Sequence, residues 1–132
     1  MKLLLDTHII LWAISDDAKL PDIARTLITD KTNEVFFSLA SVWEVEIKHE
    51  LGKIPVSGKT VYKWCTESGY IPLRVELEHI SLLSSLVRLE NTPKHNDPFD
   101  RILICQAKSE GLRFMTHDSL IPDYNEECVL SV

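Results

Sequence analysis

The sequence lacks the features that would assign the protein to a membrane or to a disulfide framework. No apolar run approaches the roughly 20 residues that span a bilayer. The N-terminus is too short and too soon acidic for a signal peptide, because one lysine and three leucines lead directly to Asp6. Only three residues are cysteines, and Cys65, Cys105 and Cys128 lie far apart. We therefore expect reduced thiols in a cytoplasmic protein, with neither a membrane span nor a zinc site.

Positive charge is also scarce. The chain has 14 lysines and arginines against 20 aspartates and glutamates, which gives a net charge of −6. This balance argues against a protein that holds nucleic acid by bulk positive charge, but not against one that uses bound cations. The length of 132 residues and the hydrophobic content of 45% are ordinary for one globular domain with a real core.

Short apolar runs and helical patterns alternate along the whole chain. The apolar runs predict strands at residues 3–5, 35–37, 70–73, 113–116 and 128–130. Periodicity, Pro and Gly predict helices at 9–14, 21–29, 39–51, 59–68, 76–90 and 98–110. Pro72 indicates that its strand lies at a sheet edge. The expected fold class is therefore α/β, one domain over residues 1–132 with a mostly parallel sheet covered on both faces.

Two of these helices carry specific burial predictions. In 39–51 one face is expected to hold Ala40, Trp43, Glu44, Ile47 and Leu51. The segment 76–90 is expected to form one helix, with a stripe of Leu77, Ile80, Leu83 and Val87.

The segment 95–107 organises the rest of the chain. Asp97 is expected to cap a helix that begins at Pro98. Asp100 then shares one face with Leu103, Ile104 and Ala107, so a carboxylate is in register with the core. An unpaired buried charge is costly. The structural alternative is that Asp100 completes a capping box and complements the helix dipole.

Three further carboxylates are expected at the same edge of the sheet. Asp6 ends the first strand, Asp118 follows the fourth, and Glu44 lies early in the helix after the second. In parallel sheets this edge is where ligands bind. Each acid also has a structural alternative: Asp6 and Asp118 as caps, and Glu44 in a capping box with Ser41 or paired with Lys48. Together, however, like charges would destabilise the fold unless a cation neutralised them, and oxygen ligands favour Mg²⁺ or Mn²⁺ over zinc.

Four segments carry a family resemblance. The segments LLLDTH (3–8), SVWE (41–44), HNDPFDR (95–101) with Gln106-Ala107, and THD (116–118) resemble the signature segments of PIN-domain ribonucleases, in order and spacing. The resemblance runs nearly end to end and is greatest to VapC-type toxins of toxin–antitoxin pairs. It implies a five-stranded parallel sheet, Mg²⁺- or Mn²⁺-dependent endonucleolytic cleavage of RNA, a cognate antitoxin that blocks the site, and a homodimer.

The resemblance also assigns residues by position. The acidic quartet matches Asp6, Glu44, Asp100 and Asp118, and Thr116 matches a supporting hydroxyl. Asp97 is an additional acid. Both lines of argument suggest hydrolysis of phosphodiester bonds by metal-activated water, with Asp6, Asp100 and Asp118 on the ion and Glu44 as a further ligand or as the residue that orients the water. Basic groups near enough in sequence to meet phosphate are Lys48, Lys94, His95 and Arg101. The alternative function is a catalytically inactive RNA- or protein-binding module whose acids serve only as caps.

The helix at residues 9–14 is apolar on every side, more than one core face can absorb. We expect part of it to lie in a homodimer or antitoxin interface. The alternative is a helix sandwiched inside the domain.

Overall fold

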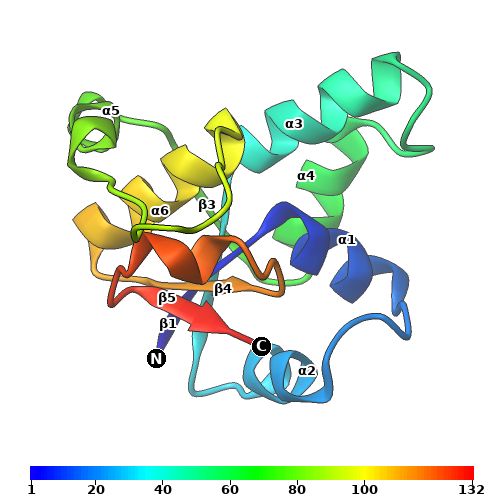
Figure 1. Ribbon diagram of the computed structural model, residues 1–132. Coiled ribbons are helices and arrows are strands. Elements are labelled where there is room, and N and C mark those ends of the chain that lie inside the picture. Colours follow the sequence, from blue (N-terminus) through cyan, green and yellow to red (C-terminus); the bar gives the residue numbers. More distant parts are fainter.

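The computed structural model describes residues 1–132 and shows strands and helices in alternation (Figure 1). The strands are β1 (Lys2–Leu5), β2 (Glu34–Ser38), β3 (Ile71–Leu73), β4 (Arg113–Thr116) and β5 (Val129–Ser131). The helices are α1 (Thr7–Ser15), α2 (Asp22–Thr29), α3 (Leu39–Glu50), α4 (Gly58–Glu67), α5 (Leu77–Ser81) and α6 (Pro98–Glu110), with 3-10 turns η1 (Leu83–Ser85) and η2 (Ile121–Tyr124). The longest helix, α6, has 13 residues, and none combines the length and hydropathy that a bilayer span requires.

All five strands are parallel and lie in the order β3-β2-β1-β4-β5, so the predicted α/β fold is confirmed. The strand with Pro72 lies at an edge, as expected. From the central β1 the chain builds outward to β3 and then returns to place β4 on the other side of β1. This reversal between β1 and β4 is the position at which open parallel sheets bind ligands.

Alternate strand residues supply two separate cores. Leu3 and Leu5 pack on one face with residues of α1, α2, α3 and α4, while Leu4 packs on the other face with α6, η1 and η2. Figure 1 shows α1, α2 and α4 on one side of the sheet and α5 and α6 on the other. Both faces are therefore covered, which explains why the strands read as continuous apolar runs rather than alternating ones.

The predicted helix 76–90 is wrong in its length and in its buried face. The structure has only α5, then η1, and an irregular segment from Leu86 to Asp97. Leu77 and Val87 are each 72% exposed, whereas His79 is fully buried. Its ring accepts the N–H of Glu76 at Nδ1 (2.9 Å) and contacts Glu110 Oε1 at Nε2 (2.8 Å), so a polar side chain with both nitrogens satisfied takes the inward position.

The predicted face of α3 is also wrong in part. Ala40 and Glu44 are buried as expected, but Trp43 is 63% exposed and Leu51 64% exposed. The inward face is completed instead by Ser41 and Val45. The buried face of α3 is therefore rotated toward Ser41 and Val45, and this rotation leaves Trp43 on the exposed side of the helix.

Candidate active site

The N-terminus of α6 separates the roles of its two aspartates. Asp97 is the N-cap, as predicted: its Oδ1 accepts the N–H groups of Phe99 (2.9 Å) and Asp100 (3.1 Å), and Pro98 follows as the first helical residue. The carboxyl of Asp100 accepts no backbone N–H, and its Oδ2 lies 3.1 Å from His95 Nε2. The alternative that Asp100 completes a capping box is therefore wrong.

Asp6 and Asp118 lie at the ends of adjacent strands and are joined through one threonine. Asp6, only 3% exposed, accepts the N–H of Thr7 at Oδ1 (2.7 Å) and the hydroxyl of Thr116 at Oδ2 (2.6 Å). The same Thr116 hydroxyl accepts the N–H of Asp118 (3.0 Å), and Asp118 Oδ1 accepts the N–H of Leu120 (2.8 Å). Thr116 thus fixes the spacing between the two acids across the β1–β4 boundary.

Glu44 enters from α3 and is 4% exposed. Its Oε1 accepts the hydroxyl of Thr7 (2.8 Å), and its Oε2 pairs with Lys48 (2.6 Å). The expected i,i+4 pair with Lys48 is confirmed. The capping box with Ser41 is wrong, because the N-cap of α3 is Ser38, three residues earlier.

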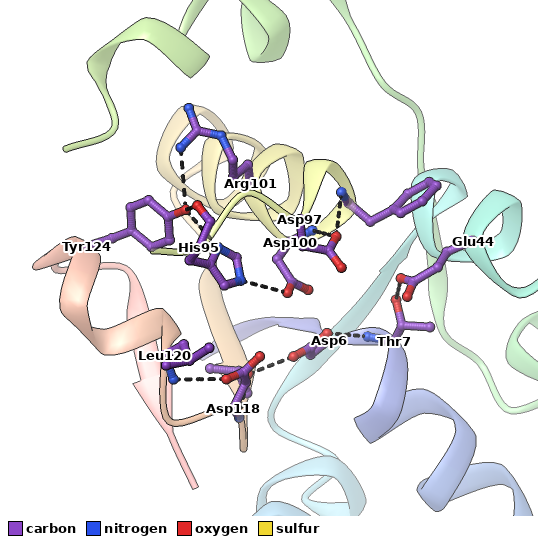
Figure 2. Close-up of polar contacts among 12 residues, drawn as sticks. Asp6, Thr7, Glu44, His95, Asp97, Asp100, Arg101, Asp118, Leu120 and Tyr124 are labelled. Carbon is purple, nitrogen blue, oxygen red and sulfur yellow. Dashed lines mark hydrogen bonds and ion pairs between the residues drawn. The ribbon is translucent and has the colours of Figure 1, made fainter. Parts of the chain in front are cut away.

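His95 is a residue that sequence reasoning considered only as a basic group near phosphate, with no role among the acids. It is 8% exposed, and its Nδ1 lies 2.7 Å from the hydroxyl of Tyr124 while Nε2 faces Asp100. Tyr124 comes from η2, 29 residues away, so no local pattern could reveal the contact. Figure 2 shows the ring turned into the acidic group and Arg101 turned away from it, toward Tyr124. The Arg101 guanidinium also donates to the carbonyl of Leu83 (3.2 Å).

Burial and like charge strongly perturb the acids. Burial first, and then the carboxylates of Asp6, Asp97, Glu44 and Asp118, raise the pKa of Asp100 to about 8. Burial also raises the pKa of Asp6, although the hydrogen bond from Thr116 partly offsets it.

Burial lowers the pKa of His95 and so favours its neutral ring.

The predicted site residues do not all lie equally close to one another. One potential ligand atom from each of His95, Asp100 and Asp118 lies within 4.8 Å of the other two. That group includes neither Asp6, which adjoins Asp118 through Thr116, nor Glu44 on α3. Figure 2 shows all of these side chains gathered at one edge, from the end of β1, α3, the segment before α6, α6 itself and the segment after β4.

An apolar groove is lined by the sequence neighbours of two of the acids. The rings of Trp43 and Phe99 meet edge to face with centroids 5.2 Å apart, each directly before an acid of the site, Glu44 and Asp100. They line a groove of about 620 Å³ between α3 and α6, with Ile80 and Ile102 among its other walls.

Comparisons with known proteins agree with this architecture. Residues 3–127 match the model of the PIN domain family. One chain of the crystal structure of VapBC2 from Rickettsia felis, bound to a DNA fragment from their promoter, superposes with a TM-score of 0.66 at 16% identity, over 100% of this chain and 98% of that one. A chain of FitAcB from Neisseria gonorrhoeae gives 0.60 at 19% identity, over 98% and 96%. No curated protein matches the sequence. At these identities the two solved structures show a shared fold.

Proposed function

The chain belongs to the PIN domain family, and from this premise we propose that it is a metal-dependent RNA endonuclease, the toxin of a toxin–antitoxin pair. The observation that carries the proposal is the carboxyl of Asp100. Its side chain is only 14% exposed, stands among four other acids and accepts no backbone hydrogen bond. A carboxyl buried among like charges, for which the first turn of α6 offers only the helix dipole as a structural reason, supports a functional role.

The residues fit a divalent cation. The group consists of carboxylates and one neutral imidazole, and Lys48, the lysine that contacts an acid of the site, is already paired with Glu44. We assign Asp6, Asp100 and Asp118 to hold Mg²⁺ or Mn²⁺, since hard cations take oxygen ligands. Such an ion supplies an acidic water and charge stabilisation for phosphodiester hydrolysis.

The chain's own residues orient this chemistry. Thr7 and Thr116 hold both oxygens of Asp6, and Leu120 holds one oxygen of Asp118, so the acids are positioned before substrate arrives. Glu44, fixed by Thr7 and Lys48, is assigned as a further ligand or as the group that orients the attacking water. Arg101 is better suited to holding Tyr124 than to contacting phosphate, because its guanidinium is turned toward the Tyr124 hydroxyl.

Two apolar surfaces fit the proposed protein partners. The groove with Trp43 and Phe99 is lined by the sequence neighbours of Glu44 and Asp100, and we assign it to the antitoxin. The second groove, also about 620 Å³, is lined by Leu11 and Ile14 of α1 together with Trp64 of α4. We assign it to the homodimer. Ile9 and Ile10, by contrast, are buried within the chain. Because its substrate is RNA, the protein would act in the cytoplasm.

The alternative of an inactive binding module has support in the caps. Asp6, Asp97 and Asp118 each accept a backbone N–H. For Asp100 it offers only the helix dipole of α6, which does not account for burial among four other acids, and for that reason we favour the nuclease.

Cleavage of RNA by the purified protein tests the proposal. We expect cleavage with Mg²⁺ or Mn²⁺, none in chelator, and loss of most activity in Asp6→Asn, Glu44→Gln, Asp100→Asn and Asp118→Asn. The matched control is Asp22→Asn, the same change at an exposed position on α2, which should leave cleavage intact. Undiminished cleavage in two of the four site variants would exclude the quartet, and metal-independent binding without cleavage would favour the inactive module.

A further inference from the structure

The ring of His95 is held by groups outside the acidic quartet. It belongs to the segment before α6 and is 8% exposed. Its Nδ1 lies 2.7 Å from the hydroxyl of Tyr124, and the same hydroxyl lies 3.0 Å from the main-chain oxygen of His95. The two rings also meet edge to face, with centroids 5.4 Å apart. Two hydrogen bonds and a ring contact therefore fix the orientation of the imidazole.

These contacts determine which ring nitrogen carries the proton. The hydroxyl of Tyr124 has a single hydrogen and donates it to the carbonyl of His95, so toward Nδ1 it can only accept. The Arg101 guanidinium, 3.3 Å from the same oxygen, is itself only a donor and leaves this assignment unchanged. Nδ1 of the neutral ring therefore carries the hydrogen, and the lone pair is on Nε2.

Nε2 is directed into the acidic group. It lies 3.1 Å from Asp100 Oδ2 (Figure 2). One ring nitrogen of His95 and one carboxylate oxygen each from Asp100 and Asp118 fall within 4.8 Å of one another. Small side-chain rotations would bring all three within reach of one ion, whose ligand bonds are about 2.1 Å long. A ligating imidazole usually donates its other N–H to a fixed acceptor, and here Tyr124 supplies that acceptor.

We propose that His95 is a nitrogen ligand of the metal ion, beside Asp100 and Asp118, and that the site consequently prefers Mn²⁺ to Mg²⁺. The inference rests on the proposed metal-dependent function and specifies its ligand set. Mg²⁺ takes oxygen ligands almost exclusively, whereas first-row transition ions also accept imidazole nitrogen. Replacing the imidazole should therefore weaken Mn²⁺ binding much more than Mg²⁺ binding.

Electron spin resonance of Mn²⁺ bound to the intact chain tests this assignment without any activity measurement. We expect nitrogen hyperfine coupling in the pulsed spectrum of the wild type, and a changed coupling pattern when histidine alone is labelled with ¹⁵N. His95→Asn should lose the coupling and bind Mn²⁺ roughly 10- to 100-fold more weakly, with Mg²⁺ affinity changed less than about threefold. His117→Asn is the matched control, because His117 adjoins Asp118 in sequence but is exposed and bonds the main chain of Val132.

The outcomes separate the two proposals. Mn²⁺ bound without histidine coupling in the wild type would exclude His95 as a ligand while leaving the metal-dependent nuclease intact. Coupling lost in His117→Asn but kept in His95→Asn would identify His117 as the nitrogen ligand and overturn the proposal for His95. No binding of Mn²⁺ or Mg²⁺ to the wild type would overturn the proposed function itself. Where His95→Asn does not fold, absence of histidine coupling in the labelled wild type still overturns the assignment. Coupling that persists in His117→Asn then supports His95, the one histidine grouped with Asp100 and Asp118.

Discussion

Replacing Asp100 by asparagine should stabilise the protein in chelator, and the gain should grow with pH. Burial and four neighbouring acids raise the pKa of Asp100 to about 8, against about 3.9 in an unfolded chain. Between these two values the folded state binds more protons than the unfolded state, so stability falls as pH rises. The slope is at most about 1.4 kcal/mol per pH unit. Asparagine has a similar shape and cannot ionise, so it removes this contribution.

The assay is thermal unfolding in chelator at pH 5, 6, 7, 8 and 9. For a domain of this size 1 kcal/mol corresponds to roughly 4 °C, so the melting temperature of Asp100→Asn should gain about 4–6 °C on wild type per pH unit. The difference should level off above the pKa of about 8. Asp22→Asn is the matched control, since Asp22 is exposed on α2 and is not one of the acids that raise the pKa of Asp100. Its curve should run nearly parallel to wild type.

Metal addition completes the experiment. Mg²⁺ or Mn²⁺ at about 100 times its dissociation constant should stabilise wild type by about 2.7 kcal/mol, and Asp100→Asn should lose most of that shift. Asp97→Ala should instead cost about 1 kcal/mol in chelator and keep some metal response. If Asp100→Asn melts below wild type in chelator and keeps its metal shift, the reasoning is refuted, and Asp100 serves the fold alone.

Two other perturbations probe the rest of the chain. Gly58→Ala would place a Cβ 2.7 Å from the carbonyl oxygen of Val42. Urea denaturation should therefore show that the free energy of unfolding falls by roughly 1–3 kcal/mol. An unchanged free energy of unfolding would contradict the close packing of α4 against α3. Leu11→Asp places a charge in the groove assigned to the homodimer, and sedimentation velocity should show a dimer converted to a monomer. A monomeric wild type at high concentration would remove that assignment.

Local signals in the sequence were sufficient for the framework. Asp97, Pro98 and Gly111 bounded α6 correctly because each acts within its own turn: a cap, a residue without an N–H, and a left-handed residue with φ of 69°. The strands were found for a similar reason, since burial on both faces leaves uninterrupted apolar runs. The convergence of acids followed from topology, because the carboxyl ends of parallel strands share one edge.

The errors fall where distant residues decide the outcome. The leucines of 76–90 have helical spacing, but the position that packs against α6 is occupied by His79, whose ring Glu110 satisfies from 31 residues away. His95 was given no role among the acids for the same reason, because its partner Tyr124 is remote in sequence. A single sequence without its tertiary contacts cannot distinguish a satisfied buried histidine from an exposed one.

The structural and functional alternatives for the acids are compatible, because a carboxylate has more than one acceptor site. Asp118 gives Oδ1 to the N–H of Leu120, and Asp6 receives Thr7 on one oxygen and Thr116 on the other, each with a further lone pair. Such bonds fix the direction of a ligand before any ion binds, which is what a preorganised site requires. Asp100 has only His95 as a partner. It is therefore the acid whose ionisation the fold compensates least, and the one for which a bound cation has the most to neutralise.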